Sequence, residues 1–182
     1  MHAELAAKLK DVLADSAVLW FRAQSAHWNV TGPQFHAYHE LFGEVYEDAW
    51  GSLDTTAEAM RQIGVFAPVS LCGLVEGEPE FSETGDAETL VREVLDANAA
   101  VTKCLYEAFA VCNQPECNAQ GIANYVAGRI EAHEKWTWQL AATLGESADK
   151  VVPTDSDDET EPPPPSNPPP KKRGAYPPGV SK

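Results

Sequence analysis

Four segments of the chain carry hydrophobic residues at steps of three and four positions, and this periodicity restricts the fold more than any other feature of the sequence. The segments span approximately residues 5–28, 34–63, 90–109 and 122–140. Thr31-Gly32-Pro33 separates the first two, and Gly64 and Gly145 stand where the second and fourth end, as glycines commonly do. Residues 64–84 form a long connection with room for a short helix. The pattern predicts an all-α four-helix bundle with a long crossover between helices 2 and 3.

Composition changes near residue 148 and divides the chain into two parts. Residues 1–148 have the hydrophobic content of a folded domain, whereas residues 149–182 contain the acidic run TDSDDETE, the run PPPPSNPPP and the basic tip KKRGAYPPGVSK. Such runs bury too little apolar surface to offset the entropy lost on ordering. We expect a Pro-rich C-terminal tail that is extended or disordered. Its tip could contact DNA, an anionic surface or a protein, or could simply solubilise the chain. The solubilising role is favoured, because four positive charges bind phosphates only weakly at physiological salt.

The negative charge belongs to the predicted bundle rather than to the tail. The net charge is −15, and residues 1–150 hold 23 acidic and 9 basic side chains. An acidic body repels nucleic-acid phosphates and attracts cations, which argues against electrostatic DNA binding and is compatible with metal handling. The same charge also serves solubility alone.

The four cysteines and the terminal segments indicate a reduced, cytoplasmic environment. Cys72, Cys104, Cys112 and Cys117 form neither a CxxC pair nor a zinc-finger spacing, which predicts free thiols. The N-terminus lacks a basic start followed by an apolar run, and no apolar stretch reaches the length of a membrane span.

Two histidines and two carboxylates between residues 27 and 58 make a ligand set suited to divalent iron or a similar metal. His27 and His39 precede Asp54 and Glu58. If residues 34–63 form one helix, His39 and Asp54 lie roughly 22 Å apart along it, because each residue adds about 1.5 Å. Metal–ligand bonds are about 2 Å long. A second copy of the chain therefore has to complete the site.

Single residues of this set also have plainer interpretations. His27 alone could be a histidine satisfied at a helix end, and Trp28 could be an interface aromatic. Asp48 is predicted to be a solvated surface acid, and His133 to be a packing residue. The grouping of His27, His39, Asp54 and Glu58 favours the metal site over these interpretations.

Three stretches resemble the Dps family, the mini-ferritins of bacteria and archaea. They are AHWNVTGPQFHAYHELF, DTTAEAMRQIG and HEKWTWQLAATL, and the resemblance spans roughly residues 3–145. It implies a ferritin-like four-helix subunit in a hollow dodecamer built from two-fold dimers. Such proteins oxidise ferrous iron, usually with hydrogen peroxide and otherwise with oxygen, and store the ferric product. The resemblance also implies His27 and His39 from one subunit, Asp54 and Glu58 from its neighbour, and Trp28 beside the site taking up oxidising equivalents.

The sequence departs from the family pattern at Gly43, where a further carboxylate usually stands. Water could fill that coordination position, His36 could contribute, or ferroxidase activity could be lost while the shell is kept. The rival function is therefore a shell or scaffold without enzymatic activity whose tail binds a partner. Zinc or manganese in place of iron also stays open.

Overall fold

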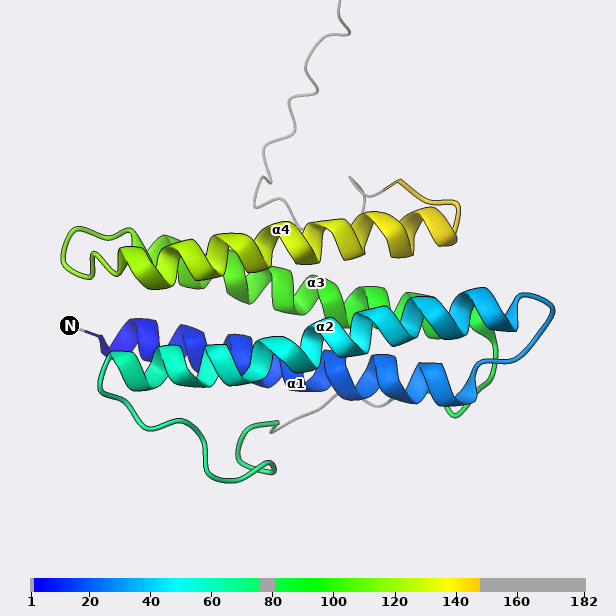
Figure 1. The fold of residues 1–182 in the computed structure, drawn as a ribbon, viewed down its shortest axis with the longest axis horizontal. Coiled ribbons are helices and arrows are strands. Elements are labelled where there is room, and N and C mark those ends of the chain that lie inside the picture. The colour runs from blue at the N-terminus through cyan, green and yellow to red at the C-terminus, as the bar shows by residue number, and fades with distance from the viewer. Residues whose placement is uncertain (1, 76–80, 148–182) are drawn as a thin grey trace, which may run out of the picture.

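The computed structural model describes residues 2–75 and 81–147 and contains four long α-helices in that part of the chain. They are α1 (Ala3–Asn29), α2 (Phe35–Gln62), α3 (Ala87–Cys112) and α4 (Gln120–Thr143). The helices run side by side as a bundle, with α1 and α2 forming one layer and α3 and α4 the other (Figure 1). The predicted all-α bundle with its long crossover between α2 and α3 is confirmed.

The structure describes most of the crossover but not the predicted tail. Residues 63–75 and 81–86 form turns and extended segments, so the short helix allowed for the crossover is not found in its described residues. The predicted tail, residues 149–182, lies outside the described residues. Among the helices that are described, none combines the length and apolar composition that a membrane span requires.

Local chemistry explains where the helices begin and end. Gly64 has φ +83°, and the amides of Gly64 and Val65 donate to the carbonyls of Arg61 and Met60. Gly145 ends α4 in the same way with φ +73°. This pattern satisfies carbonyls that the helix leaves free and needs a residue that tolerates positive φ. The predicted stops at Gly64 and Gly145 are confirmed.

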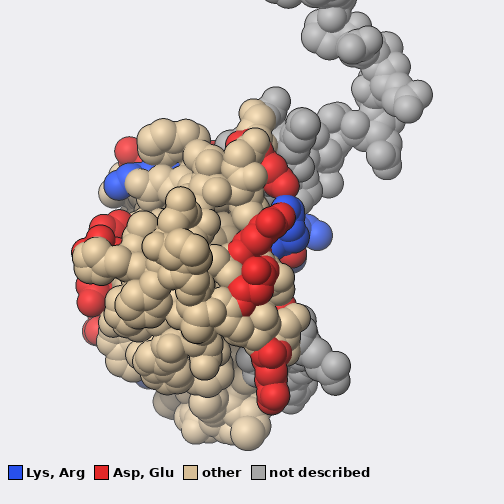
Figure 2. Space-filling view, turned by 90° about the vertical axis from the view of Figure 1, so that its right-hand side faces the viewer, with Lys and Arg blue, Asp and Glu red and all other residues tan. Residues whose placement is uncertain are grey.

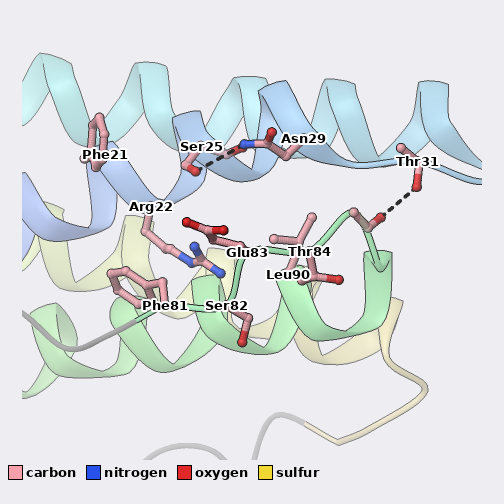
Figure 3. Close-up of a pocket in the computed structure, with 11 residues that line it drawn as sticks. Phe21, Arg22, Ser25, Asn29, Thr31, Phe81, Ser82, Glu83, Thr84 and Leu90 are labelled. Carbon is pink, nitrogen blue, oxygen red and sulfur yellow. Dashed lines mark hydrogen bonds between the residues drawn. The ribbon is translucent and has the colours of Figure 1, made fainter.

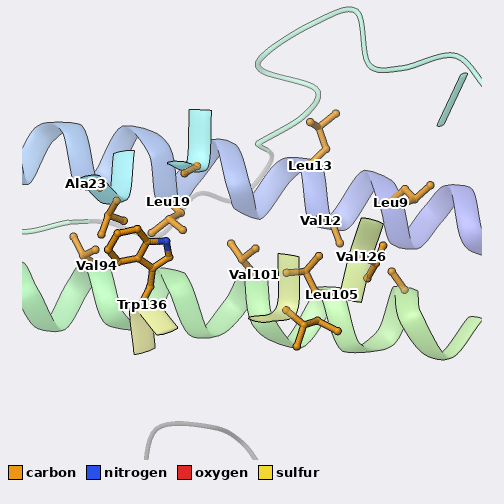
Figure 4. Close-up of a cluster of buried hydrophobic side chains, with 14 of the residues drawn as sticks. Leu9, Val12, Leu13, Leu19, Ala23, Val94, Val101, Leu105, Val126 and Trp136 are labelled. Atoms are coloured by element: carbon orange, nitrogen blue, oxygen red, sulfur yellow. The ribbon is translucent and has the colours of Figure 1, made fainter. Parts of the chain in front are cut away.

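The core lies between the two layers and is built from the predicted periodic positions. Leu9, Leu19, Val94, Leu105 and Val126 are all fully buried, and Figure 4 shows several of these side chains meeting between α1, α3 and α4. The four cysteines are free thiols, as predicted. Removal of this apolar surface from water is the main contribution to the stability of the bundle.

A polar network joins α2, α3 and α4. Asp48 accepts two hydrogen bonds of 2.8 Å from the guanidinium of Arg129 and a third of 2.8 Å from Trp136 Nε1. Arg129 also lies 3.1 Å from His133 Nε2, and His133 Nδ1 lies 2.7 Å from Asn98 Oδ1.

This network corrects one prediction and confirms another. Asp48 is half-buried and ion-paired, so its prediction as a solvated surface acid was wrong. Its partner Arg129 is 81 residues away in the chain, where local periodicity gives no signal. His133 is 1% exposed, which confirms it as a packing residue.

Candidate metal centre

His27 and His39 are brought together at the turn between α1 and α2, and the backbone carbonyl of each fixes the ring of the other. His27 Nδ1 donates to the backbone carbonyl of His39 at 2.7 Å, and His39 Nδ1 donates to the carbonyl of His27 at 2.8 Å. The two rings stack with centroids 3.5 Å apart. Because both Nδ1 atoms carry hydrogens in these bonds, Nε2 of each ring keeps the lone pair that a metal ion needs.

The end of α1 makes this reciprocal pairing possible. The next amide in the helical pattern, that of Thr31, bonds to the carbonyl of Gly85 at 2.9 Å instead of that of His27. The carbonyl of His27 is therefore one of the free acceptors of a helix C-terminus, and the His39 ring satisfies it. Gly32, with φ +114°, turns the chain between the two helices.

Aromatic rings flank the histidine pair on both sides. Phe35 stacks on His39 with centroids 5.0 Å apart, and Tyr46 meets the ring of His27 edge-on at 5.2 Å. Both lie on α2, one turn before His39 and two turns after it. Neither residue figured in the predicted site. Their spacing from His39 in a helix is the signal that would have found them.

Gly43 lies directly against the predicted ligand His27. A Cβ atom added to Gly43 would stand 3.5 Å from His27 Nδ1 and 3.6 Å from Cε1, which are ordinary contacts. Sterics therefore do not require glycine here. A carboxylate at position 43 would reach the neighbourhood of the histidine pair, as the resemblance implies for relatives.

Asp54 and Glu58 lie away from the histidines, on the exposed face of α2. They stand one turn apart on that helix. The premise of the distance estimate is confirmed, since α2 is continuous from Phe35 to Gln62, which separates His39 and Asp54 by roughly 22 Å. Within one chain, the described residues hold no group of three or more His, Cys, Asp or Glu side chains that could bind a metal ion. The four-residue site stays a prediction that needs a second subunit.

The alternative ligand His36 points to solvent rather than to the histidine pair. Its Nε2 lies 3.4 Å from Glu40 Oε1, and the side chain is 84% exposed. In this arrangement it is an ordinary surface pair of one helical turn.

An aromatic strip, defined as Trp20, Phe21, Trp28 and Trp50, connects the two halves of the predicted site. Ring centroids are 4.9 Å apart for Trp20 and Trp50, 6.0 Å for Trp20 and Phe21, and 6.3 Å for Phe21 and Trp28. Phe21, Trp28 and Trp50 are 47%, 60% and 58% exposed. Trp28 follows His27 in the chain, and Trp50 lies one turn before Asp54. Exposed aromatic surface of this extent is typical of a protein interface.

A cavity of about 690 Å³ lies beside this strip, between α1 and residues 81–85 (Figure 3). In its wall, the guanidinium of Arg22 pairs with Glu93 and lies 4.2 Å from the centre of the Phe81 ring. Thr31 fastens the far end through its hydroxyl, which donates to Gly85 O at 3.1 Å. The described residues of the lining include no histidine or cysteine, and the contacts of Phe81 and Gly85 join the end of the crossover to α1.

Acidic side chains dominate the charged surface at the end of the bundle that carries the histidine pair. Figure 2 shows them on both flanks of that end, with few basic side chains among them. Along α2 the exposed residues Glu40, Glu44 and Glu47 continue toward Asp54 and Glu58 on one face. Such a surface raises the local concentration of cations.

Known proteins resemble the chain over most of its length. The family model for the ferritin-like domain matches residues 6–148. The DNA protection during starvation protein of Brevibacillus brevis is 30% identical over 142 residues, which are 77% of this chain and 94% of that protein. Antigen TpF1 of Treponema pallidum is 35% identical over 146 residues, which are 78% of this chain and 81% of that protein.

Solved structures of Dps proteins also resemble this chain. Dps from Vibrio cholerae, a member of a broad superfamily of ferritin-like diiron-carboxylate proteins, has a TM-score of 0.71 at 23% identity, over 77% of this chain and 88% of that one. Dps from Listeria monocytogenes has a TM-score of 0.72 at 17% identity, over 80% and 96%. At these identities the superpositions show a common fold. Together with the sequence matches, they establish that this chain belongs to the Dps family of ferritin-like proteins.

Proposed function

We propose that the protein is a mini-ferritin that binds ferrous iron between two subunits, oxidises it and stores the ferric product in a hollow dodecamer. His27 and His39 of one subunit and Asp54 and Glu58 of its neighbour hold the iron. The reciprocal hydrogen bonds between the two histidines carry this proposal, because they leave both Nε2 atoms ready for a metal. The exposed aromatic strip supports a two-fold partner on this face.

The chemistry follows from the donor set. Imidazoles suit ferrous iron, and carboxylate oxygens favour the harder ferric ion. Two ferrous ions each give one electron to hydrogen peroxide, the O–O bond breaks, and two hydroxide ions form. Because both electrons arrive together, no hydroxyl radical leaves the site, and Trp28 takes up oxidising equivalents that escape. Iron storage in a cytoplasmic shell then protects against oxidative damage.

Complementation between two inactive variants tests whether the site spans two subunits. One chain carries His27→Ala and His39→Ala, and the other carries Asp54→Ala and Glu58→Ala. Each alone should oxidise ferrous iron no faster than buffer does. When the two variant chains pair at random in two-fold dimers, about a quarter of the sites between subunits receive intact histidines from one chain and intact carboxylates from the other. A mixture that stays inactive although mixed oligomers form would mean that the site is not shared in this way.

The oxidant and the metal are determined on the native protein. We expect faster ferrous oxidation with hydrogen peroxide than with oxygen, followed by stopped-flow absorbance. Zinc and manganese suit part of the same donor set. Their addition before iron should slow oxidation if they compete at His27 and His39. Equal rates with and without zinc would contradict a site built on these two imidazoles.

The second candidate is a shell without ferroxidase activity, which the glycine at position 43 favours. Aerobic loading with ferrous iron followed by size exclusion separates the two functions. Iron that elutes with a dodecamer-sized species supports the mini-ferritin. Iron that remains in the small-molecule fraction supports the shell.

A further inference from the structure

A groove between α2 and α4 is lined by none of the four predicted metal ligands. This α2–α4 groove has a volume of about 510 Å³. Its walls come from the start of α2 and the end of α4, and are Gln34, Ala37, Tyr38, Leu41, Trp138, Gln139, Ala142 and Thr143. The helix α1, which carries most of the aromatic strip, contributes none of these residues.

The groove combines exposed aromatic surface with an unsatisfied hydrogen-bond acceptor. The indole of Trp138 is 59% exposed, and Tyr38 forms part of the opposite wall. The side-chain oxygen of Gln139 is buried and receives no hydrogen bond from any described residue. A buried acceptor without a donor is unfavourable, because it has lost its hydrogen bonds to water. A ligand that supplies apolar rings and one donor therefore suits this groove.

A proline-rich segment has these properties. Grooves lined by aromatic residues recognise proline runs, because the polyproline helix is preformed and loses little entropy on binding. Residues 162–170 of this chain read PPPPSNPPP. The prolines supply apolar rings on both sides of Ser166 and Asn167, and these two residues supply the donors that proline lacks.

We propose that residues 162–170 dock in the α2–α4 groove of their own chain. Thr143, which lines the groove, lies four residues before Ser147, the last residue of the described bundle. Residues 148–161 then separate the bundle from the proline run, and a chain of that length extends up to about 50 Å. The run therefore reaches the groove without strain.

Covalent connection makes even a weak contact sufficient. A ligand joined to its site by a short flexible linker meets that site at an effective concentration on the order of millimolar. A dissociation constant of about 1 mM for the free peptide then fills the groove roughly half of the time.

Photo-crosslinking in the full-length chain tests this docking. The variant Trp138→p-benzoylphenylalanine keeps an aromatic ring in the groove, and Leu71→p-benzoylphenylalanine is the control, since Leu71 is comparably exposed at 64% but lies in the crossover, outside the groove and outside the aromatic strip. After trypsin digestion, we expect position 138 to crosslink to fragment 151–171 at least about five times more often than position 71 does. Equal yields from the two positions would overturn the proposal.

Two further measurements identify the occupant. Replacement of Pro162, Pro163, Pro164 and Pro165 by serine should abolish the crosslink, whereas Asp157→Asn with Asp158→Asn should keep most of it. Mixing ¹⁵N-labelled and unlabelled subunits distinguishes chains. Crosslinks found only between chains, or from position 138 to the helices of another copy, would replace tail docking with contact between subunits. Because the metal site plays no part here, the result is independent of ferroxidase activity.

Discussion

At the level of single residues, Gly43 is the position where we expect a substitution to raise the activity. Its added Cβ would make only ordinary contacts with His27. We expect Gly43→Asp to raise the initial rate of ferrous oxidation by peroxide several-fold, because the new carboxylate lies beside the histidine pair. Stopped-flow absorbance of the native and variant proteins measures the change.

Gly43→Ala is the matched control for that variant. It should raise the free energy of unfolding by about 0.5–1 kcal/mol, since glycine is the poorer helix former, and leave the oxidation rate unchanged. Urea denaturation measures the stability. A rate increase in Gly43→Ala equal to that in Gly43→Asp would show that helix rigidity, rather than a new ligand, limits the reaction.

His133 predicts how stability depends on pH. Burial, together with the charge of Arg129, lowers the pKa of His133 to about 3. Below about pH 6.5 the His133 imidazole therefore binds a proton in the unfolded chain but stays neutral in the folded chain. Stability should fall by up to about 1.4 kcal/mol per pH unit between about pH 6 and 4. Urea denaturation at several pH values measures how the free energy of unfolding changes with pH. That change should be smaller for His133→Gln than for the native protein, by the equivalent of close to one proton. The same pH dependence in both proteins would contradict a neutral buried imidazole.

At the level of helices, the sequence was most informative where the chemistry is local. Hydrophobic periodicity and the stops at Gly64 and Gly145 predicted the four helices, because both signals depend on neighbours in the chain. The hydrogen bonds between His27 and His39 depend on where α1 ends and how Gly32 turns, which spacing alone does not specify. Asp48 lies three residues after the core residue Val45, so it stands at the edge of the apolar stripe of α2. A charged residue at that position was the one feature of the sequence that pointed to a buried ion pair.

The pairing of α2 with α4 through Asp48 and Arg129 can be tested by a double-mutant cycle. Burial opposes ionisation of Asp48, yet the hydrogen bonds from Arg129 and Trp136 outweigh it and lower the pKa of the carboxyl. Arg129→Met should destabilise the bundle by about 2 kcal/mol or more, because Asp48 is left without its counter-charge. Adding Asp48→Asn should recover part of that loss. Fully additive losses in urea denaturation would show that the two residues are not coupled.

At the level of the whole molecule, the aromatic strip is expected to hold the two-fold dimer together. Trp50→Glu places a charge at one end of that strip, and should shift the protein to monomers and abolish fast ferrous oxidation while the helices remain. Light scattering after size exclusion and circular dichroism measure both effects. The control Val69→Glu changes a residue that is 97% exposed outside the strip, and should keep the dimer. A Trp50→Glu dimer with native activity would place the interface elsewhere.

The reciprocal hydrogen bonds of His27 and His39 also bear on how such a site arises and decays. Each imidazole is oriented by the backbone carbonyl of the other's position, and any residue supplies that carbonyl. Replacing one histidine therefore removes one ligand but keeps the hydrogen bond that orients the other. The histidine pair can thus be lost and regained in evolution one residue at a time, as can the carboxylates on the open face of α2.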